Sequence, residues 1–260
     1  MKKIFNLINT EEENPENQIE INEIPNSFEI IGNIAHLNLR EKFLPYKFLI
    51  GKIILDKNPA IKTVITKTGK IDNEFRTYNM DLLAGDENFE IVHREGNINF
   101  HFDIRKVYWC SRLQGERDRL LKVIKKGQVL CDAFCGVGPL ALRAAKNGVK
   151  VYASDLNPDC YSCLNKNIQI NKIPKGKLYS FNMDAREFIR MCISQGLNQN
   201  EENNNEGFFI QGEKIDHFYM NLPKDAIEFL DAFKGAFKDN EIYNPENLPI
   251  VHVYGFSNAI

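Results

Sequence analysis

The sequence predicts an α/β protein, in which a parallel sheet is covered by helices and preceded by a small α+β domain. From about residue 107, apolar strand-like segments alternate with helix-like segments, a rhythm typical of parallel sheets. Between residues 28 and 102, short apolar stretches alternate with turn signals instead. With 260 residues, 43% of them hydrophobic, the chain can bury at least one full core.

We expect three parts along the chain. Residues 1–25 are polar, rich in Asn and Glu, and without periodicity, so they predict a flexible arm. Residues 26–104 predict the small α+β domain, with one helix over 40–54. Residues 105–260 predict the α/β domain, in which the Asn/Gln/Glu-rich segment at about 194–212 is a surface insertion loop.

The elements of the α/β domain follow from this alternation. The strands are expected at 128–133, 149–154, 177–181, 215–220 and 249–254, and the helices at 112–126, 138–147, 157–171, 184–193 and 223–237.

Composition excludes several classes of protein. No apolar run approaches the roughly 20 residues of a membrane span, so no membrane partner is expected. The six cysteines have no disulfide framework, and Cys160 and Cys163 lack a second pair, so neither disulfides nor a metal is expected. The net charge is −2, but residues 40–76 and 105–126 are basic. They are either a phosphate-binding face or ordinary solvated surfaces.

A glycine loop follows the first strand of the α/β domain. Gly136, Gly138 and Ala141 fit the G-x-G-x-x-A pattern of dinucleotide sites, and Asp155 follows at a suitable spacing. Glycines at a strand end let the backbone approach a ligand at a helix N-terminus. The loop alone does not separate a nicotinamide cofactor from S-adenosyl-L-methionine.

Acidic residues at successive strand ends favour S-adenosyl-L-methionine. Asp132 is placed to receive the ammonium group of the cofactor's amino acid, which nicotinamide dinucleotides lack. Asp155 can hold two ribose hydroxyls, and Asp184 can accept from an adenine amino group. Each of the last two also reads as a helix N-cap, a role compatible with binding.

The fourth strand ends in Asn221-Leu222-Pro223. The amide of Asn221 can pair with a base edge, and Pro223 makes the turn rigid. This is where methyltransferases acting on ring or exocyclic nitrogens hold their target base, although a helix-capping Asn is an equally good interpretation of the residue alone.

Together these motifs resemble the archaeal and eukaryotic tRNA (guanine-37-N1)-methyltransferase family. The resemblance is carried by FEIIGNIAHLNLREKFLPYKFLIGKIILDKNPAIKTVITK, EFRTYNMDLLAGD, DIRKVYWCSRLQGERDRL, DAFCGVGP, SDLNPD and MNLP. It implies a Rossmann-like class I methyltransferase domain after the small α+β domain. It also implies transfer of a methyl group from S-adenosyl-L-methionine to N1 of guanosine 37 in tRNA. We expect a eukaryotic member that lacks the family's extra N-terminal domain and final strand pair.

The resemblance assigns residues to roles. Arg76 would contact the guanine and stabilise charge on its O6, Glu116 would be the general base, and Asn221 would join them in catalysis. The target base would be bordered by Arg76, Tyr108, Asn221 and Pro223. The cofactor would be lined by Arg117, Asp132, Phe134, Gly136, Asp155, Leu156, Asp184, Ala185 and Asn221.

The chemistry of guanine supports two of these roles. N1 carries a proton at neutral pH, so a base such as Glu116 must remove it before methylation. Negative charge then builds on O6, where a guanidinium such as that of Arg76 is favourable. Glu116 also lies in an ERDRL helix, where Glu–Arg surface pairs are common.

Three other functions stay open. One is a tRNA aminocarboxypropyltransferase of the wybutosine pathway, which Asn221-Leu222-Pro223 disfavours. A nicotinamide-dependent oxidoreductase would leave Asp132, Asp184 and Arg76 without a task, and an inactive tRNA-binding protein would not need Glu116. We expect a monomer in the cytoplasm, the nucleus or both, with a mitochondrial pool left open.

Overall fold

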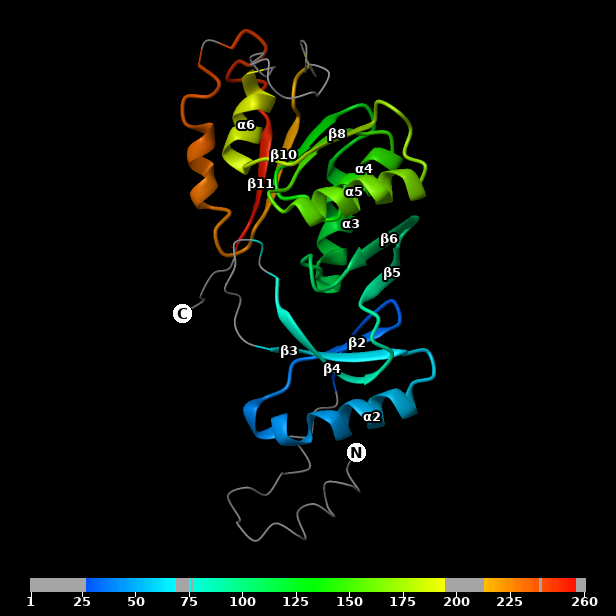
Figure 1. Ribbon diagram of the computed structural model, residues 1–260. Coiled ribbons are helices and arrows are strands. Elements are labelled where there is room, and N and C mark those ends of the chain that lie inside the picture. The colour runs from blue at the N-terminus through cyan, green and yellow to red at the C-terminus, as the bar shows by residue number, and fades with distance from the viewer. Residues whose placement is uncertain (1–26, 69–74, 76, 195–212, 239, 256–260) are drawn as a thin grey trace, which may run out of the picture. The chain divides into compact units, whose positions relative to one another are not determined.

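The computed structural model describes residues 27–68, 75, 77–194, 213–238 and 240–255 (Figure 1). The chain divides into two compact units, Met1–His93 with Phe102–Tyr108, and Arg94–His101 with Trp109–Ile260. In the described ranges, no helix has the length and apolar character needed to cross a membrane. The expected arm at 1–25, and most of the expected insertion loop at 194–212, lie outside these ranges.

The first unit contains a mixed four-stranded sheet. Its strands β1 (Glu29–Ile31), β2 (Ile34–Leu37), β3 (Thr63–Thr68) and β4 (Asn79–Gly85) pair in that order. The helix expected over 40–54 is a 3₁₀ helix, η3 (Glu41–Tyr46), followed by α2 (Lys47–Lys57). Pro45 lies inside η3 and has no N–H to donate, which agrees with an irregular first turn. Apolar residues of α2, including Ile50 and Ile54, share a buried cluster with β2 and β3.

The second unit is built on a five-stranded parallel sheet. Its strands are β7 (Val129–Asp132), β8 (Lys150–Ser154), β9 (Leu178–Phe181), β10 (His217–Asn221) and β11 (Ile250–Tyr254), in the order β11-β10-β7-β8-β9. Every neighbouring pair is parallel, so the predicted fold class is confirmed. The order reverses between β7 and β10, and such switch points are where open α/β sheets bind ligands.

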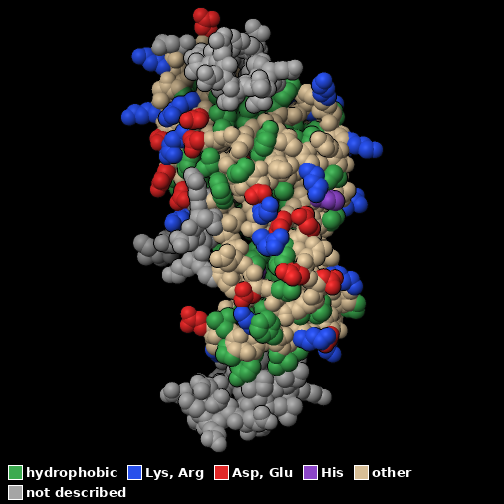
Figure 2. All heavy atoms as spheres, in the orientation of Figure 1, with side chains coloured by type: hydrophobic (Ala, Val, Ile, Leu, Met, Phe, Trp, Pro, Cys, Tyr) green, Lys and Arg blue, Asp and Glu red, His purple; other side chains and the backbone are tan. Residues whose placement is uncertain are grey.

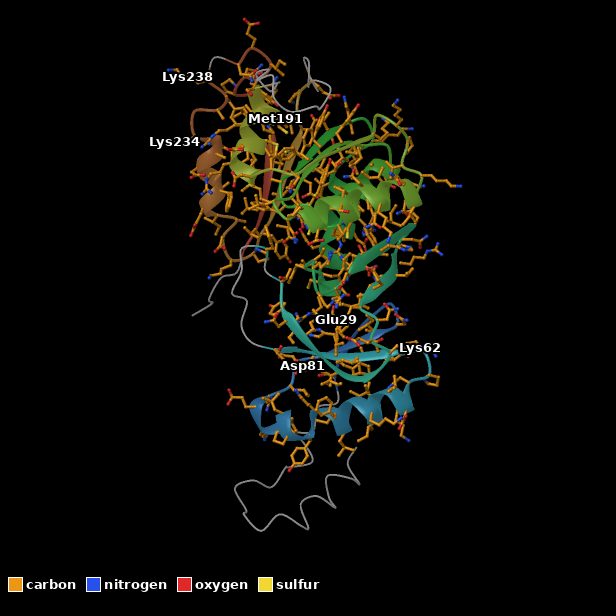
Figure 3. The ribbon with its side chains drawn as sticks, viewed as in Figure 1. Glu29, Lys62, Asp81, Met191, Lys234 and Lys238 are labelled. Atoms are coloured by element: carbon orange, nitrogen blue, oxygen red, sulfur yellow. The ribbon has the colours of Figure 1, made fainter. Side chains whose placement is uncertain are left out.

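Helices lie between the strands, close to their expected positions. They are α3 (Gln114–Val123, preceded by η4, Ser111–Leu113), α4 (Ala141–Lys146), α5 (Pro158–Ile170) and α6 (Ala185–Ser194). A large apolar cluster of the second unit joins α6 to β7, β8 and β10. Met191 of α6 belongs to this cluster (Figure 3). The same figure labels Glu29 of β1 and Asp81 of β4, which belong to the first unit.

One expected helix is wrong. The segment 223–237 forms turns around a 3₁₀ helix, η5 (Glu228–Phe233), rather than an α-helix. The backbone leaves the helical region at Lys234, which is extended, and Gly235 follows with φ +72°. Phe233 still packs edge-on against Phe218 of β10, so the segment covers the sheet as expected.

Two buried asparagines, Asn167 on α5 and Asn171 directly after it, bind β6 (Ile98–Asp103), which forms a hairpin with β5 (Glu90–Glu95). Asn171 accepts from the N–H of Asn99 at 2.8 Å and donates to its carbonyl at 2.7 Å. Asn167 accepts from the N–H of His101 at 2.9 Å. These amides satisfy backbone groups of β6 as a further strand would.

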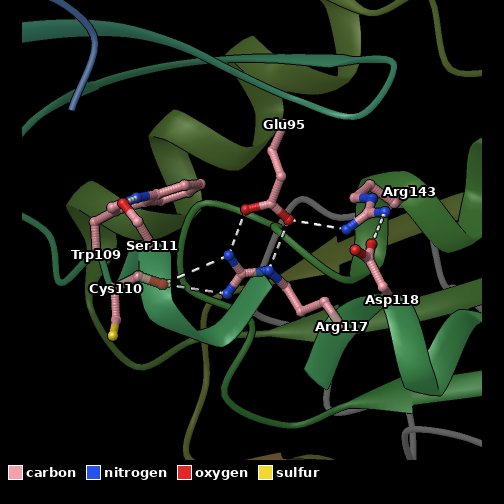
Figure 4. Close-up of polar contacts among 7 residues, drawn as sticks. All are labelled: Glu95, Trp109, Cys110, Ser111, Arg117, Asp118 and Arg143. Carbon is pink, nitrogen blue, oxygen red and sulfur yellow. Dashed lines mark hydrogen bonds and ion pairs between the residues drawn. The ribbon is translucent and has the colours of Figure 1, made fainter. Parts of the chain in front are cut away.

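A buried ionic network joins the same hairpin to α3 and α4 (Figure 4). Glu95 has a fully buried side chain, and both of its oxygens accept from Arg117. Arg143 donates to Glu95 at 2.9 Å and also pairs with Asp118. Arg117 further lies 5.5 Å from the ring of Trp109, which is buried. Since a buried charge is tolerated only when paired, the network fixes the position of α3.

Replacing Arg117 with Leu should therefore destabilise the chain by about 3–5 kcal/mol, because Glu95 would lose its main partner in a buried site. Chemical denaturation measures this cost. The double variant Glu95→Met with Arg117→Leu should recover most of the loss, since it leaves no unpaired carboxylate and Arg143 keeps Asp118. A cost below about 1 kcal/mol for the single variant would contradict the argument.

The second loop glycine is required for packing. A Cβ on Gly138, whose φ is +89°, would lie 2.5 Å from Cδ1 of Leu164 on α5. Gly127 is a matched control, because its φ is +88° but a Cβ there would meet nothing within 4 Å. Gly127→Ala should cost about 1–2 kcal/mol of backbone strain, and Gly138→Ala about 1–3 kcal/mol more from the clash. Equal losses of unfolding free energy for the two variants would refute the packing role.

Candidate cofactor and substrate site

Four polar residues predicted from the sequence lie at the carboxyl ends of strands in the parallel sheet. Asp132 ends β7, and Asn221 ends β10, the neighbouring strand across the switch point. Asp155 follows β8, and Asp184 lies between β9 and α6. Since the strands are parallel, all four occupy the same edge of the sheet.

Asp132 is buried, with 1% of its surface exposed, and its Oδ1 has no hydrogen-bond partner among the described residues. Burial, followed by the nearby charge of Asp155, raises the pKa of Asp132 to about 8, and a hydrogen bond from the Phe134 N–H opposes this shift. Phe134 packs edge-on against Phe229 at 5.0 Å. An unpaired buried acceptor costs free energy unless a ligand satisfies it.

Asp155 organises the glycine loop. Its carboxylate accepts from the N–H of Gly136 at 2.8 Å and from the N–H of Asn157 at 3.0 Å. Burial raises the pKa of Asp155, while these two backbone hydrogen bonds and a third from the side chain of Cys160 lower it. A carboxylate has about four acceptor sites, and the two backbone bonds and the Cys160 side chain use three of them, so Asp155 keeps capacity for one further donor such as a hydroxyl.

Gly136 has a different role from Gly138. It has φ +53°, and a Cβ there would meet nothing within 4 Å, so its face of the loop is open. The segment after β8 is held by Asn182, whose amide donates to the carbonyl oxygens of Asp155 and Leu156 at 2.8 and 2.9 Å. The side chain of Leu156 is 41% exposed. A closely approaching ligand would therefore meet backbone at Gly136 and an apolar side chain at Leu156.

Asp184 caps α6. Its Oδ1 accepts from the N–H of Arg186 at 2.8 Å and from that of Glu187 at 3.3 Å, and Ala185 after it is buried. The N-cap interpretation is thus confirmed for Asp184, while contact of Asp184 and Ala185 with adenine stays a prediction. For Asp155 it is wrong, because Asn157 caps α5 by accepting from the N–H of Asp159.

Asn221 carries the second unsatisfied group of this edge. Its Oδ1 is buried and has no hydrogen-bond partner among the described residues. The chain turns directly after it, as the N–H groups of Asp225 and Ala226 bond to the carbonyl of Leu222 at 2.9 and 2.7 Å. Pro223 opens this turn. Asn221 does not cap a helix here, which leaves its amide for a ligand.

These residues fit the groups of S-adenosylmethionine. A cationic ammonium group would satisfy Oδ1 of Asp132 and favour its ionised form. A ribose hydroxyl matches the remaining acceptor capacity of Asp155, and the open face of Gly136 allows a ligand close to the backbone.

Glu116 lies on α3 and is paired with Arg119. Arg119 donates through Nε to Oε2 at 2.7 Å and through Nη2 to Oε1 at 2.6 Å. This hydrogen bond lowers the pKa of Glu116, against a smaller effect of burial. The carboxylate is therefore ionised at neutral pH, as a general base must be.

For three predicted site residues, the structure gives no contact with the residues at the strand ends. Arg117 is buried in the network with Glu95, so its predicted contact with the cofactor stays a prediction. Tyr108 is 43% exposed and belongs to the first unit, and its place beside the target base also stays a prediction. Arg76 lies outside the described residues.

Sequence reasoning missed Glu95, Asn182 and Arg119. The sequence holds a local signal for Arg119 alone, because a spacing of three residues from Glu116 predicts an ion pair on one face of a helix. Glu95 and Asn182 contact partners far away in sequence, which no local pattern reveals.

Similar proteins cover nearly the whole chain. A protein named tRNA (guanine(37)-N(1))-methyltransferase from Schizosaccharomyces pombe is 43% identical over 253 residues, covering 89% of this chain and 57% of that protein. One of the same name from Phytophthora infestans is 45% identical over 237 residues, covering 91% and 53%. The chain thus spans about half the length of these curated relatives.

Solved structures agree in fold. The crystal structure of Trm5b from Pyrococcus abyssi has a TM-score of 0.67 at 33% identity, covering 89% of this chain and 60% of that one. The complex of aTrm5 with tRNALeu has a TM-score of 0.65 at 29% identity, covering 88% and 61%. TYW2 of P. horikoshii in complex with MeSAdo has a TM-score of 0.60 at 25% identity, covering 90% and 75%.

Two family models match the chain in sequence. Residues 11–88 match the TYW2 N-terminal domain, and residues 91–254 match the TRM5/TYW2 methyltransferase domain. The second match spans more than half of the chain and includes every strand of the parallel sheet. The chain belongs to the TRM5/TYW2 methyltransferase family.

Proposed function

We propose that this chain transfers a methyl group from S-adenosyl-L-methionine to N1 of guanosine 37 in tRNA. The proposal is supported by the relatives at 43–45% identity, whose names state this activity, and by the structural neighbour solved with tRNALeu. The observation that carries it is the pair of buried, unsatisfied acceptors on Asp132 and Asn221, at adjacent strand ends. An aspartate acceptor suits the cofactor's ammonium, and an amide suits a base edge.

Each proposed residue has a defined task. The bound cofactor supplies an electrophilic methyl group on a sulfonium. Asp132, Asp155 and Asp184 hold its ammonium, ribose and adenine. Glu116 accepts the N1 proton, Arg76 stabilises the charge on O6, and Asn221 orients the base. Alignment of the methyl group with N1 then contributes much of the remaining acceleration.

The basic residues of 40–76 and 105–126 would bind RNA phosphates less readily than their number in the sequence indicates. On the face drawn in Figure 2, Lys and Arg side chains are interspersed with Asp and Glu. Lys47 pairs with Asp81 at 2.6 Å, and Lys52 with Asp56 at 2.9 Å. These two lysines already have carboxylate partners, so phosphate binding by Lys47 or Lys52 would require exchange of partners.

The second candidate is transfer of the cofactor's aminocarboxypropyl group. The match to the TYW2 N-terminal domain and the TYW2 structural neighbour favour considering it. The two reactions use one cofactor and differ in the group that leaves the sulfonium. Mass spectrometry of a tRNA product therefore distinguishes them directly.

Binding of the cofactor should release a proton from Asp132. The pKa of this carboxyl, about 8 in the free chain, makes it mostly protonated at pH 7, and a neighbouring ammonium favours the ionised form. Titration calorimetry at pH 7 in two buffers of different ionisation enthalpy should reveal the release for the natural chain. Asp132→Asn should remove it and weaken binding by roughly 10–100-fold. Identical buffer dependence in the two proteins would contradict the role of Asp132.

The reaction should require an acceptor at position 6 and a proton on N1 of the target base. Among transcripts with guanosine, inosine or adenosine at position 37, the first two should gain a methyl group on N1, and adenosine should gain none, because it reverses the donor and acceptor.

The variant Glu116→Gln tests the base separately, because it keeps the shape of the side chain but cannot take the proton. It should slow single-turnover transfer by roughly 10²–10⁴-fold with little change in cofactor affinity. Methylation of adenosine, a product modified at N7 or N2, or an aminocarboxypropyl product would overturn the proposed function.

A further inference from the structure

The Glu116 carboxylate is not free on the surface of α3. Both of its oxygens accept from a single guanidinium, that of Arg119, one turn further along the helix. The side chain of Glu116 is 22% exposed and that of Arg119 is 57% exposed. A two-point contact of this kind fixes both the rotation and the direction of a carboxylate, which a single lysine contact does not.

The helix that carries the pair is itself fixed. Arg117, between the two residues in sequence, is buried against Glu95. Glu116 and Arg119 thus extend from a helix that cannot readily rotate about its axis, because rotation would withdraw Arg117 from a fully buried carboxylate.

Among the described residues, the other titratable groups near Glu116 are His252 and Tyr219, and near Arg119 also Tyr254. Burial lowers the pKa of His252 and of His217 beside it, so both are neutral at pH 7. Tyr219 has its pKa raised, chiefly by burial, and is neutral too. Within the part of the chain that the structure describes, the full positive charge next to Glu116 therefore comes from Arg119.

The hydrogen bonds of the two histidines define their neutral form. The Lys125 N–H donates to Oε1 of Gln128 at 2.6 Å, so the atom 3.2 Å from Nε2 of His217 is an acceptor, and Nε2 carries a proton. Nδ1 of His217 then accepts from Nε2 of His252 at 3.0 Å. The remaining nitrogen of His252, Nδ1, has a lone pair and cannot donate to Glu116.

We propose that Arg119 is a positioning residue for the methyl-transfer reaction, holding both oxygens of Glu116 in the place where one of them receives the proton of the target base. This inference rests on the proposed function of Glu116 as the base. Each oxygen keeps a second lone pair beside its contact with Arg119, so the base N1–H can bind without displacing the guanidinium. Asn and Gln at position 119 could not make the same two-point contact.

Single-turnover methyl transfer to a guanosine-37 transcript, measured from pH 4 to pH 8, tests the inference, because the lowered pKa of Glu116 puts the acidic limb below pH 5. Arg119→Gln should slow transfer by roughly 10–100-fold at pH 7 through loss of orientation, and should move the acidic limb of the profile to higher pH, because the pKa of Glu116 is no longer held down. Arg119→Lys should return the acidic limb of the pH profile to the position it has in the natural chain, but should recover only part of the transfer rate at pH 7. Arg190→Gln, which removes an exposed arginine from α6, is the matched control and should change neither.

A second arm separates positioning from other roles. In the Glu116→Gln background, Arg119→Gln should have no further effect, because the pair acts as a unit. An equal slowing in both backgrounds, or an unmoved limb with weaker tRNA binding, would overturn the inference and make Arg119 a phosphate contact. Full activity of Glu116→Gln would instead refute Glu116 as the base, and with it this inference, whereas the proposed methyl transfer is judged separately by the identity of the tRNA product.

Discussion

The buried carboxylate of Glu95 is the interaction on which the arrangement of the second unit depends. It is fully buried and is held by Arg117 of α3 and Arg143 of α4. A buried charge without partners is very costly, so the hairpin tip, α3 and α4 must come together in one geometry. The position of Glu116 on the outer side of α3 follows from the inward anchoring of its neighbour Arg117.

At the carboxyl ends of the strands, unlike around Glu95, buried polar oxygens lack hydrogen-bond partners among the described residues. Around Glu95 both carboxylate oxygens are satisfied, whereas Oδ1 of Asp132 and Oδ1 of Asn221 are buried without a partner. Unsatisfied buried acceptors each cost on the order of 1–3 kcal/mol. The parallel sheet, paired on both sides of β7 and β10, is rigid enough to hold them in place. Such local conflicts are typical of binding sites, where a ligand completes the hydrogen bonding.

Much of this edge could be predicted from the sequence, because its signals are local. A buried parallel strand is a short apolar run, and a polar residue directly after it must lie at the sheet edge, which places Asp132, Asp155 and Asn221. The segment 223–237 was mispredicted since its apolar spacing suits a helix, while Lys234 and Gly235 end the helical backbone early. Contacts between distant residues, such as those of Glu95, leave no periodic trace.

Two carboxyl groups of the same unit are driven in opposite directions by their surroundings. Burial beside Asp155 raises the pKa of Asp132, and the guanidinium of Arg119 lowers that of Glu116. A group that is neutral until a cation arrives suits the binding of an ammonium, whereas a group kept ionised suits the acceptance of a proton. The same pairing lowers the proton affinity of Glu116, so in the proposed reaction its effectiveness as a base depends on geometry. In that reaction the fixed helix α3, and the arginine on its exposed side, matter as much as the carboxylate does.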